Sequence, residues 1–222
     1  GYHRKSWEDF WILQTLWQTG MLSEGKRGIG FGVGTEVLPA YFASKCIPVL
    51  ATDAALTPKI VHDWFKTNQH SGGDVLRFNC TNLCDPAQLT KLVSYRVVNM
   101  NSIPSELEGF DFTWSAGSFD HLGTLANGLA FVANSLRVLK PGGIAVHTTE
   151  YNLFSNDHTI DKGDTVFYRK KDLEQCHAHF GTIADVPPLD LTRGDREYDM
   201  KPDVAPFLQE PHLCLSNGGL TA

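Results

Sequence analysis

The clearest pattern of apolar positions in the chain is an amphipathic helix near its middle. From Leu125 to Leu139, apolar residues recur at spacings of four, three, four and three, which places them on one face of a helix. Pro141 and two glycines then end the helix, and a short apolar run follows at 144–149. A continuous run of this length is typical of a strand that is buried on both faces. The middle of the chain therefore predicts a helix followed directly by a buried strand.

The same alternation of strand and helix extends over most of the chain. Strands are expected in the segment that leads into Gly30 and at 47–52, 95–98, 110–114, 144–149, 166–168 and 213–215. Helices are expected at 35–44, 58–67, 85–93, 125–139 and 171–179. Strands and helices that alternate in this way form a parallel sheet covered on both faces. We therefore expect an α/β fold with a Rossmann-like, doubly wound and mostly parallel seven-stranded sheet and helices on both faces.

A further helix is predicted at 7–19, ahead of the first strand. Phe10, Leu13 and Trp17 recur there at helical spacing. We expect this apolar stripe to pack into the core. Because the helix comes just before a glycine-rich loop, residues 1–25 are also a candidate lid over a bound ligand.

Composition and charge argue against several classes of protein. The chain of 222 residues has a net charge of -6, which disfavours a broad nucleic-acid-binding surface. Its five cysteines are odd in number and irregularly spaced, which favours reduced thiols over a secreted disulfide framework. The sequence contains no run of about 18 apolar residues, so no membrane span is expected. We therefore expect a cytoplasmic globular protein.

Three alternating glycines mark the point where the first strand meets the first helix of the sheet. Gly30, Gly32 and Gly34 would expose bare backbone beside the N–H groups of a helix N-terminus, where a ligand can approach closely. Asp53 ends the second predicted strand, and ligands of open α/β sheets bind at the carboxyl ends of the strands. A carboxylate at that place can accept both hydroxyls of a ribose. Together the two features predict a site for a nucleotide-like cofactor.

The spacing of the glycines separates two classes of cofactor. A dinucleotide fingerprint, G-x-G-x-x-G, needs a glycine at position 35, where the chain has Thr35. The loop is G-x-G-x-G instead. A nicotinamide-dependent oxidoreductase is therefore disfavoured.

The G-x-G-x-G loop resembles the first motif of the class I S-adenosylmethionine-dependent methyltransferases. Asn99-Met100 is similar to the pair that holds the adenine in that family, and 110–115 is similar to its fourth strand. The run Leu139-Lys140-Pro141-Gly142-Gly143 matches the L-K-P-G-G turn before strand five. The resemblance covers about 28–150, which we expect to be the cofactor-binding core. It implies S-adenosylmethionine as the cofactor, bound by Gly30, Phe31, Gly32, Gly34, Asp53, Ala54, Asn99, Met100 and Ser115.

Two positions depart from the pattern of that family. Gly28 stands where many members carry an acid that bears on the methionine ammonium, and Asn99 replaces the acid of the third strand. An Asn side-chain oxygen can still accept a hydrogen bond from the adenine amino group. A non-catalytic S-adenosylmethionine-binding domain of the same fold therefore stays open as an alternative to an enzyme.

Two side chains are candidates for the reaction centre. The segment 118–123 resembles the E-H segment of small-molecule and lipid methyltransferases, with Asp120 in place of Glu. His121 in this segment can act as general base for an acceptor hydroxyl, or equally as a hydrogen-bonding residue at a helix start. Glu150 closes the fifth strand on the same rim and is the second candidate. His147 lies inside an apolar strand and is expected to be structural.

The resemblance implies that the acceptor is a small molecule, a sugar or a lipid-linked glycan, methylated at oxygen. The fourth strand lacks the N/D-P-P-Y/F motif of nucleic-acid methyltransferases. No metal site is expected, because neither Cys80 with Cys84 nor the segment 176–179 has a diagnostic spacing. We expect one domain over 1–222, with residues 151–222 on the substrate side.

Overall fold

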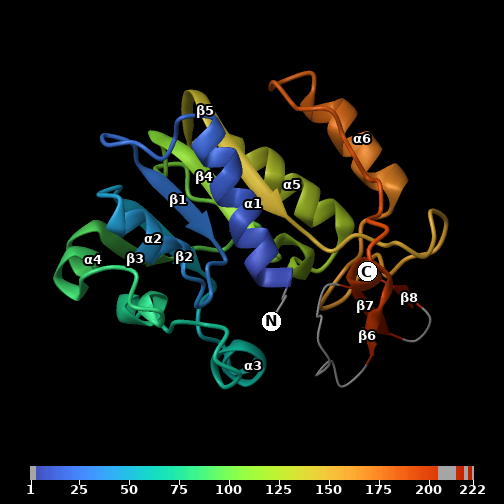
Figure 1. The fold of residues 1–222 in the computed structure, drawn as a ribbon, viewed down its shortest axis with the longest axis horizontal. Helices are drawn as coiled ribbons and strands as arrows, with labels where there is room; N and C mark the ends of the chain where they lie inside the picture. The colour runs from blue at the N-terminus through green and yellow to red at the C-terminus, as the bar shows by residue number, and fades with distance from the viewer. Residues whose placement is uncertain (1–3, 205–213, 218–219, 222) are drawn as a thin grey trace.

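Five parallel strands form the central sheet (Figure 1). The computed structural model describes residues 4–204, 214–217 and 220–221. The five strands are β1 (Gly28–Phe31), β2 (Val49–Asp53), β3 (Val93–Val97), β4 (Phe110–Ala116) and β5 (Leu139–Thr148). Their order across the sheet is β3-β2-β1-β4-β5, and every neighbouring pair is parallel. The expected doubly wound parallel sheet is therefore confirmed.

The direction of winding reverses at β1. The chain moves outward from β1 to β2 and β3, and then returns to place β4 on the other side of β1. All residues of β1 and β2 are buried, as the apolar runs predict for strands covered on both faces. A reversal of this kind leaves a crevice beyond the carboxyl ends of the two strands that flank it.

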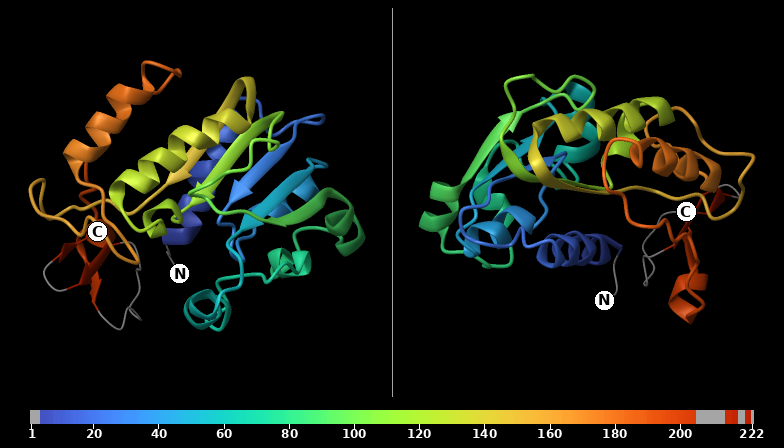
Figure 2. Two further views of the ribbon diagram at one scale, coloured as in Figure 1. Left: turned by 180° about the vertical axis from the view of Figure 1, so that it is seen from behind. Right: turned by 90° about the horizontal axis from the view of Figure 1, so that it is seen from above.

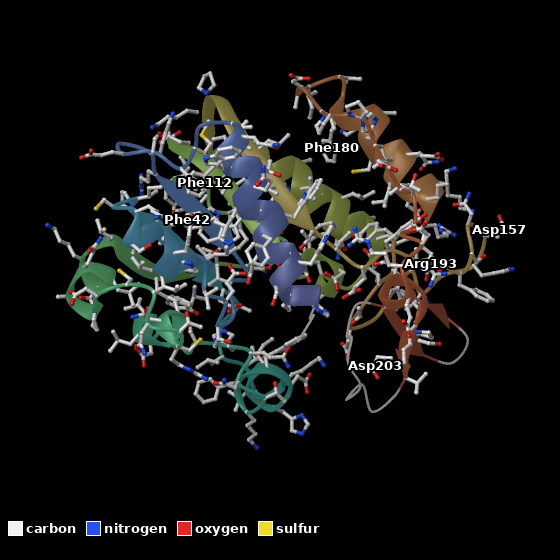
Figure 3. The ribbon with its side chains drawn as sticks, viewed as in Figure 1. Phe42, Phe112, Asp157, Phe180, Arg193 and Asp203 are labelled. Carbon is white, nitrogen blue, oxygen red and sulfur yellow. The ribbon has the colours of Figure 1, made fainter. Side chains whose placement is uncertain are left out.

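One face of the sheet is covered by α1 (Arg4–Gln18), α2 (Leu38–Ser44) and α4 (Pro86–Leu92). The aromatic rings of Phe42 and Phe112 pack there with centroids 5.1 Å apart (Figure 3). The helix α4 begins where the sequence predicts, because Asp85 accepts hydrogen bonds from the N–H groups of Ala87 and Gln88.

The opposite face is covered by α5 (Leu125–Ser135), and Figure 2 shows α1 and α5 on opposite sides of the sheet. Thr124 caps α5 by accepting a hydrogen bond from the N–H of Asn127. Phe31 and Phe131 pack between this helix and β1, with ring centroids 5.4 Å apart. The prediction of helices on both faces is thus confirmed.

The seven-strand count is not confirmed in the described part of the chain. Residues 166–168 form only an isolated bridge, between Tyr151 and Tyr168. The strand expected at 213–215 corresponds to β7 (Cys214–Asn217), with residue 213 outside the described residues, and it belongs to a separate small sheet. That sheet has the order β6 (Pro202–Val204), β7 and β8 (Leu220–Thr221).

The remaining elements are short, apart from α6 (Lys170–Phe180), which confirms the late helix. They comprise α3 (Pro58–Ile60), which continues as the π-helical turn η1 (Val61–Phe65), the 3-10 turns η2 (Val75–Asn79), η3 (Phe119–His121) and η4 (Leu136–Val138), and the helix α7 (Glu197–Met200). Within the described ranges, none of the helices combines the length and apolar character that crossing a membrane requires.

The N-terminal helix buries a different face from the one that the sequence predicts. Phe10 is 72% exposed and Trp17 is 66% exposed, while Ile12 and Leu16 are fully buried. The prediction that these residues pack into the core was therefore wrong for Phe10 and Trp17, and Leu13 is only partly buried. The buried side chains one turn apart place α1 against β4 and β5, beside the carboxyl ends of the strands.

Candidate cofactor cleft and active site

A cleft of about 960 Å³ opens at the carboxyl ends of β1, β2, β3 and β4. This volume lies within the range of roughly 300–1,000 Å³ that small-molecule sites occupy. Its walls come from the loops after these strands, from the first turns of α1 and from the helical segment that contains Trp64. The cleft therefore coincides with the crevice at the reversal of the sheet.

The glycine loop forms the floor of the cleft. Gly32 and Gly34 both line it and have positive φ angles of 62° and 55°, a conformation that favours glycine. A Cβ atom at Gly34 would lie 2.5 Å from the carbonyl oxygen of Gln69, and one at Gly32 would lie 2.7 Å from Cβ of Ser118. Side chains at these positions would collide with the neighbouring segments, so the loop keeps bare backbone at the cleft.

Asp53 lines the cleft at the end of β2 and braces the glycine loop. The N–H of Gly34 donates to its Oδ2 at 3.0 Å, and the N–H of Ala54 donates to its Oδ1 at 2.7 Å. Burial raises the pKa of Asp53, while His70, with Nε2 3.5 Å from Oδ2, and the two backbone N–H groups oppose the rise. Each carboxylate oxygen has further lone pairs for hydroxyl donors.

His70 is a buried residue of this wall that the sequence reasoning missed. Its Nε2 lies 3.0 Å from the carbonyl oxygen of Ala54, and its Nδ1 accepts a hydrogen bond from the N–H of Gly72. A carbonyl oxygen can only accept, so Nε2 carries a proton. The ring holds the loop after β2 against the loop that carries Gly72.

The residues that follow β3 form the side wall beyond Asp53. Asn99 is exposed and Met100 is buried, and both line the cleft. The side-chain oxygen of Asn99 accepts a hydrogen bond from the N–H of Asn101 at 2.9 Å, which closes a local turn. Ala54 lines the cleft as well.

Four of the predicted site residues do not line the cleft. Gly30 packs against the Trp114 ring, and Phe31 is fully buried in the core. Ser115 is buried and hydrogen-bonded to Nδ1 of His147 at 2.8 Å. Glu150 lies two residues past the end of β5, and its carbonyl oxygen accepts a hydrogen bond from the N–H of Tyr168. Gly30, Phe31 and Ser115 support the cleft from behind.

His121 lines the cleft from the turn η3, which follows β4. Its Nδ1 lies 2.7 Å from the carbonyl oxygen of Asp164 and 3.1 Å from the hydroxyl of Thr165. A carbonyl oxygen can only accept, so Nδ1 carries a proton, and Nε2 lies 3.5 Å from Oδ2 of the buried Asp120. Trp64 packs edge-on to this imidazole, with ring centroids 4.7 Å apart. The structure therefore brings His121 to the cleft with its ring oriented by partners at both nitrogens.

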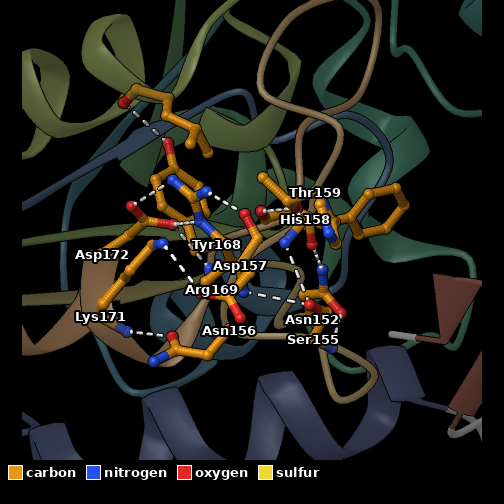
Figure 4. Close-up of polar contacts among 12 residues, drawn as sticks. Asn152, Ser155, Asn156, Asp157, His158, Thr159, Tyr168, Arg169, Lys171 and Asp172 are labelled. Atoms are coloured by element: carbon orange, nitrogen blue, oxygen red, sulfur yellow. Dashed lines mark hydrogen bonds and ion pairs between the residues drawn. The ribbon is translucent and has the colours of Figure 1, made fainter.

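The segment 152–172, whose residues Asp164 and Thr165 contact His121, is fixed by a polar network (Figure 4). Arg169 forms a two-bonded ion pair with Asp172 and donates to the carbonyl oxygen of Asp157. Asn152 donates to the carbonyl oxygen of His158 and accepts from two N–H groups of its own turn. Both ends of the segment 152–172 are thus anchored, which positions Asp164 and Thr165 against His121.

Three charged residues of the cleft were also missed by the sequence reasoning. Lys5 and Asp9 come from α1, one helical turn apart, and Glu36 follows the glycine loop. The indole Nε1 of Trp114 donates to Oε1 of Glu36 at 2.6 Å. Their spacing in α1 was the available signal, because residues four apart share a helix face.

No group of three His, Cys, Asp or Glu side chains is placed to hold a metal ion in the ranges that the structure describes. All five cysteines are free thiols, among them Cys80, Cys84 and Cys176.

Comparison with solved structures gives several chains of similar fold. A proposed sarcosine dimethylglycine methyltransferase from Galdieria sulphuraria is 22% identical, over 65% of this chain and 46% of that one, with a TM-score of 0.48. The glycopeptide N-methyltransferase MtfA is 12% identical, over 68% of this chain and 57% of that one, with a TM-score of 0.47. A methyltransferase from Clostridium acetobutylicum is 12% identical, over 79% of each chain, with a TM-score of 0.47. This chain thus spans about half the length of the first two structures.

No curated protein matches the chain. The model of a protein family described as "Methyltransferase domain" matches residues 28–147, which is more than half of the 222 residues. The matched range begins with β1 and ends inside β5, so it contains the whole central sheet and the glycine loop. The chain therefore belongs to the methyltransferase domain family, within the class I S-adenosylmethionine-dependent methyltransferases.

Proposed function

We propose that this chain binds S-adenosylmethionine in the cleft and transfers its methyl group to an oxygen atom of a small-molecule, sugar or lipid-linked glycan acceptor. The observation that carries the proposal is the convergence of the bare loop at Gly32 and Gly34, the carboxylate of Asp53 and the imidazole of His121 on one cleft. In this proposal α1 is the lid and residues 151–222 form the acceptor side.

The residues present fit the cofactor. Bare backbone at Gly32 and Gly34 admits the close approach of its methionine part. The oxygens of Asp53 retain lone pairs for the two ribose hydroxyls, and Asn99 with Met100 would hold the adenine. When bound, S-adenosylmethionine supplies a methyl carbon that its sulfonium has already activated. The protein has to align the acceptor and remove one proton.

His121 is the group proposed to remove that proton. Nε2 of His121 would accept the proton of the acceptor hydroxyl, and S-adenosylmethionine, when bound, would supply the methyl group to the oxygen that loses this proton. The carbonyl oxygen of Asp164 keeps Nδ1 protonated and stabilises the imidazolium that results. Such bases typically contribute about 10²–10⁴-fold in rate. Glu150 stays the second candidate, but His121 lines the cleft and Glu150 does not, which favours His121.

Isothermal titration calorimetry with S-adenosylmethionine, S-adenosylhomocysteine and NAD tests the cofactor class. Binding of the first two without binding of NAD is the expected result. Binding of NAD alone would replace the proposal by a nicotinamide-dependent activity, and absence of binding by all three would refute it. Binding without any loss of the methyl group in the presence of candidate acceptors would favour the non-catalytic alternative.

A further inference from the structure

The position that carries an acid in many family members cannot carry one here. A Cβ atom at Gly28 would collide with the ring of Phe112, which is fully buried against the neighbouring strand. The amino-acid end of S-adenosylmethionine bears an ammonium group, and a buried cation needs a compensating charge. If the proposed cofactor binds, that charge has to come from elsewhere in the cleft.

Glu36 is placed to supply it. The residue follows the glycine loop directly and lines the cleft beside Gly34. The indole N–H of the fully buried Trp114 fixes Oε1 at 2.6 Å, and it is the sole hydrogen-bond partner of this carboxylate among the described residues. The other oxygen, Oε2, is thereby held in a defined orientation and available to a ligand.

The first turns of α1 bring further charges to the same part of the cleft. Asp9 and Lys5 line it, and Nζ of Lys5 donates to the carbonyl oxygen of Ala116, at the end of β4, at 3.1 Å. Glu8 forms an ion pair with Lys5 at 3.3 Å and accepts a hydrogen bond from Thr148. Two carboxylates and one ammonium group thus line the cleft between the glycine loop and the end of β4.

We propose that Glu36, assisted by Asp9, binds the ammonium group of the amino-acid end of the cofactor and replaces the carboxylate that Gly28 excludes. The inference rests on the proposed function, because it assigns a residue within the same site. It explains how a chain without the family acid can keep a charged partner for the ligand. A short, buried contact of this kind is charge-assisted and roughly twice as strong as a neutral hydrogen bond.

The electrostatics of the cluster support this assignment. Burial raises the pKa of Glu36 well above its usual range, Asp9 and Glu8 add to the rise, and Lys5 and the Trp114 N–H oppose it. Burial also raises the pKa of Asp9 to about 6. A cationic ligand stabilises the ionised carboxylates. Affinity for the ligand should therefore increase as the pH rises and the two carboxyl groups lose their protons.

The test compares two ligands that differ in the amino-acid group. S-adenosylhomocysteine carries it, and 5′-methylthioadenosine lacks it. Calorimetry on the full chain should show that Glu36→Gln weakens binding of S-adenosylhomocysteine by about 10- to 100-fold, while the affinity for 5′-methylthioadenosine stays within about two-fold. Asp9→Asn should give a smaller loss of the same selectivity. Glu108→Gln, an exposed site off the cleft, is the matched control.

Each other outcome is decisive. Unchanged binding of S-adenosylhomocysteine by Glu36→Gln would overturn the inference, and an equal loss for both ligands would show a structural role of Glu36. If the unaltered chain binds neither ligand, the proposed function itself fails, and this result is visible before any variant is made.

Discussion

Asp53 and His121 each perform a structural task besides the one proposed for a ligand. Asp53 accepts hydrogen bonds from the N–H groups of Gly34 and Ala54, so it shapes the glycine loop. His121 is oriented by the carbonyl oxygen of Asp164, a residue 43 positions later in the chain. The position of Asp53 could be predicted from a strand pattern and its distance from the glycines. The partner of His121 could not, because nothing local in the sequence indicates a contact across that separation.

At Asn99, the account predicts a graded response to substitution. Asn99→Asp should bind S-adenosylmethionine as tightly as the unaltered chain or more tightly, because an anionic acceptor makes a stronger hydrogen bond to the adenine amino group. Asn99→Leu should bind about 5- to 20-fold more weakly, the loss of one ordinary hydrogen bond. Calorimetry on the three proteins checks this order. Equal affinities would mean that the Asn99 side chain serves only its turn with Asn101.

His147 should make the stability of the protein depend on pH. Its ring lies between the hydroxyls of Ser115 and Ser135, and burial lowers its pKa from 6.5 to about 4. In the unfolded chain the imidazole takes up a proton near pH 6.5, whereas in the folded chain it takes one up only near pH 4. Its contribution is therefore complete above pH 6.5 and is lost as the pH falls toward 4, by about 3 kcal/mol.

Urea unfolding of the unaltered chain and of His147→Asn, from pH 7 to pH 4, measures this contribution. The difference between the two proteins cancels Asp9 and Glu36, whose raised pKa values act in the opposite direction. The gap in free energy of unfolding should narrow by about 3 kcal/mol toward pH 4. Two parallel curves would contradict the burial of a neutral imidazole.

At the scale of the element, prediction succeeded where capping residues and apolar period agreed. Asp85 and Pro86 start α4 as expected. The L-K-P-G-G run was expected to be a turn before the strand, but it forms the first half of β5, and the 3-10 turn η4 separates it from α5. The helix α1 shows the limit. It carries apolar residues around most of its circumference, so the spacing of these residues predicts a helix but does not indicate which of its faces is buried.

The buried face of α1 can be tested with two neighbouring residues. Ile12→Ala should lower the free energy of unfolding by about 2–4 kcal/mol, because it leaves a cavity in the core. Trp11→Ala removes a larger side chain, but one that is 54% exposed and stacked on Trp7, and should cost less than about 1.5 kcal/mol. Urea denaturation of both variants checks the order. A greater loss in free energy of unfolding for Trp11→Ala than for Ile12→Ala would mean that the face of α1 described as buried is not the one that packs against the sheet.

At the scale of the whole molecule, the cleft results from strand order. The order β3-β2-β1-β4-β5 brings the loops after four strands to one end of the sheet. The sequence predicted this core, because alternating strands and helices leave few topologies. It did not predict the arrangement of the segment between β5 and α6. There, backbone contacts such as Val166 to Asp120 and Gly163 to Gly123 replace the expected strand, and such contacts have no periodic signature.

A crystal structure of the protein with S-adenosylhomocysteine tests the central claim most directly. The account predicts the ligand in the cleft, with the ribose hydroxyls about 2.6–3.2 Å from the oxygens of Asp53 and the adenine edge at Asn99. The sulfur should lie within about 8 Å of Nε2 of His121, close enough for an acceptor hydroxyl to lie between them. A ribose away from Asp53, a sulfur far from His121, or a ligand bound outside the cleft would contradict it.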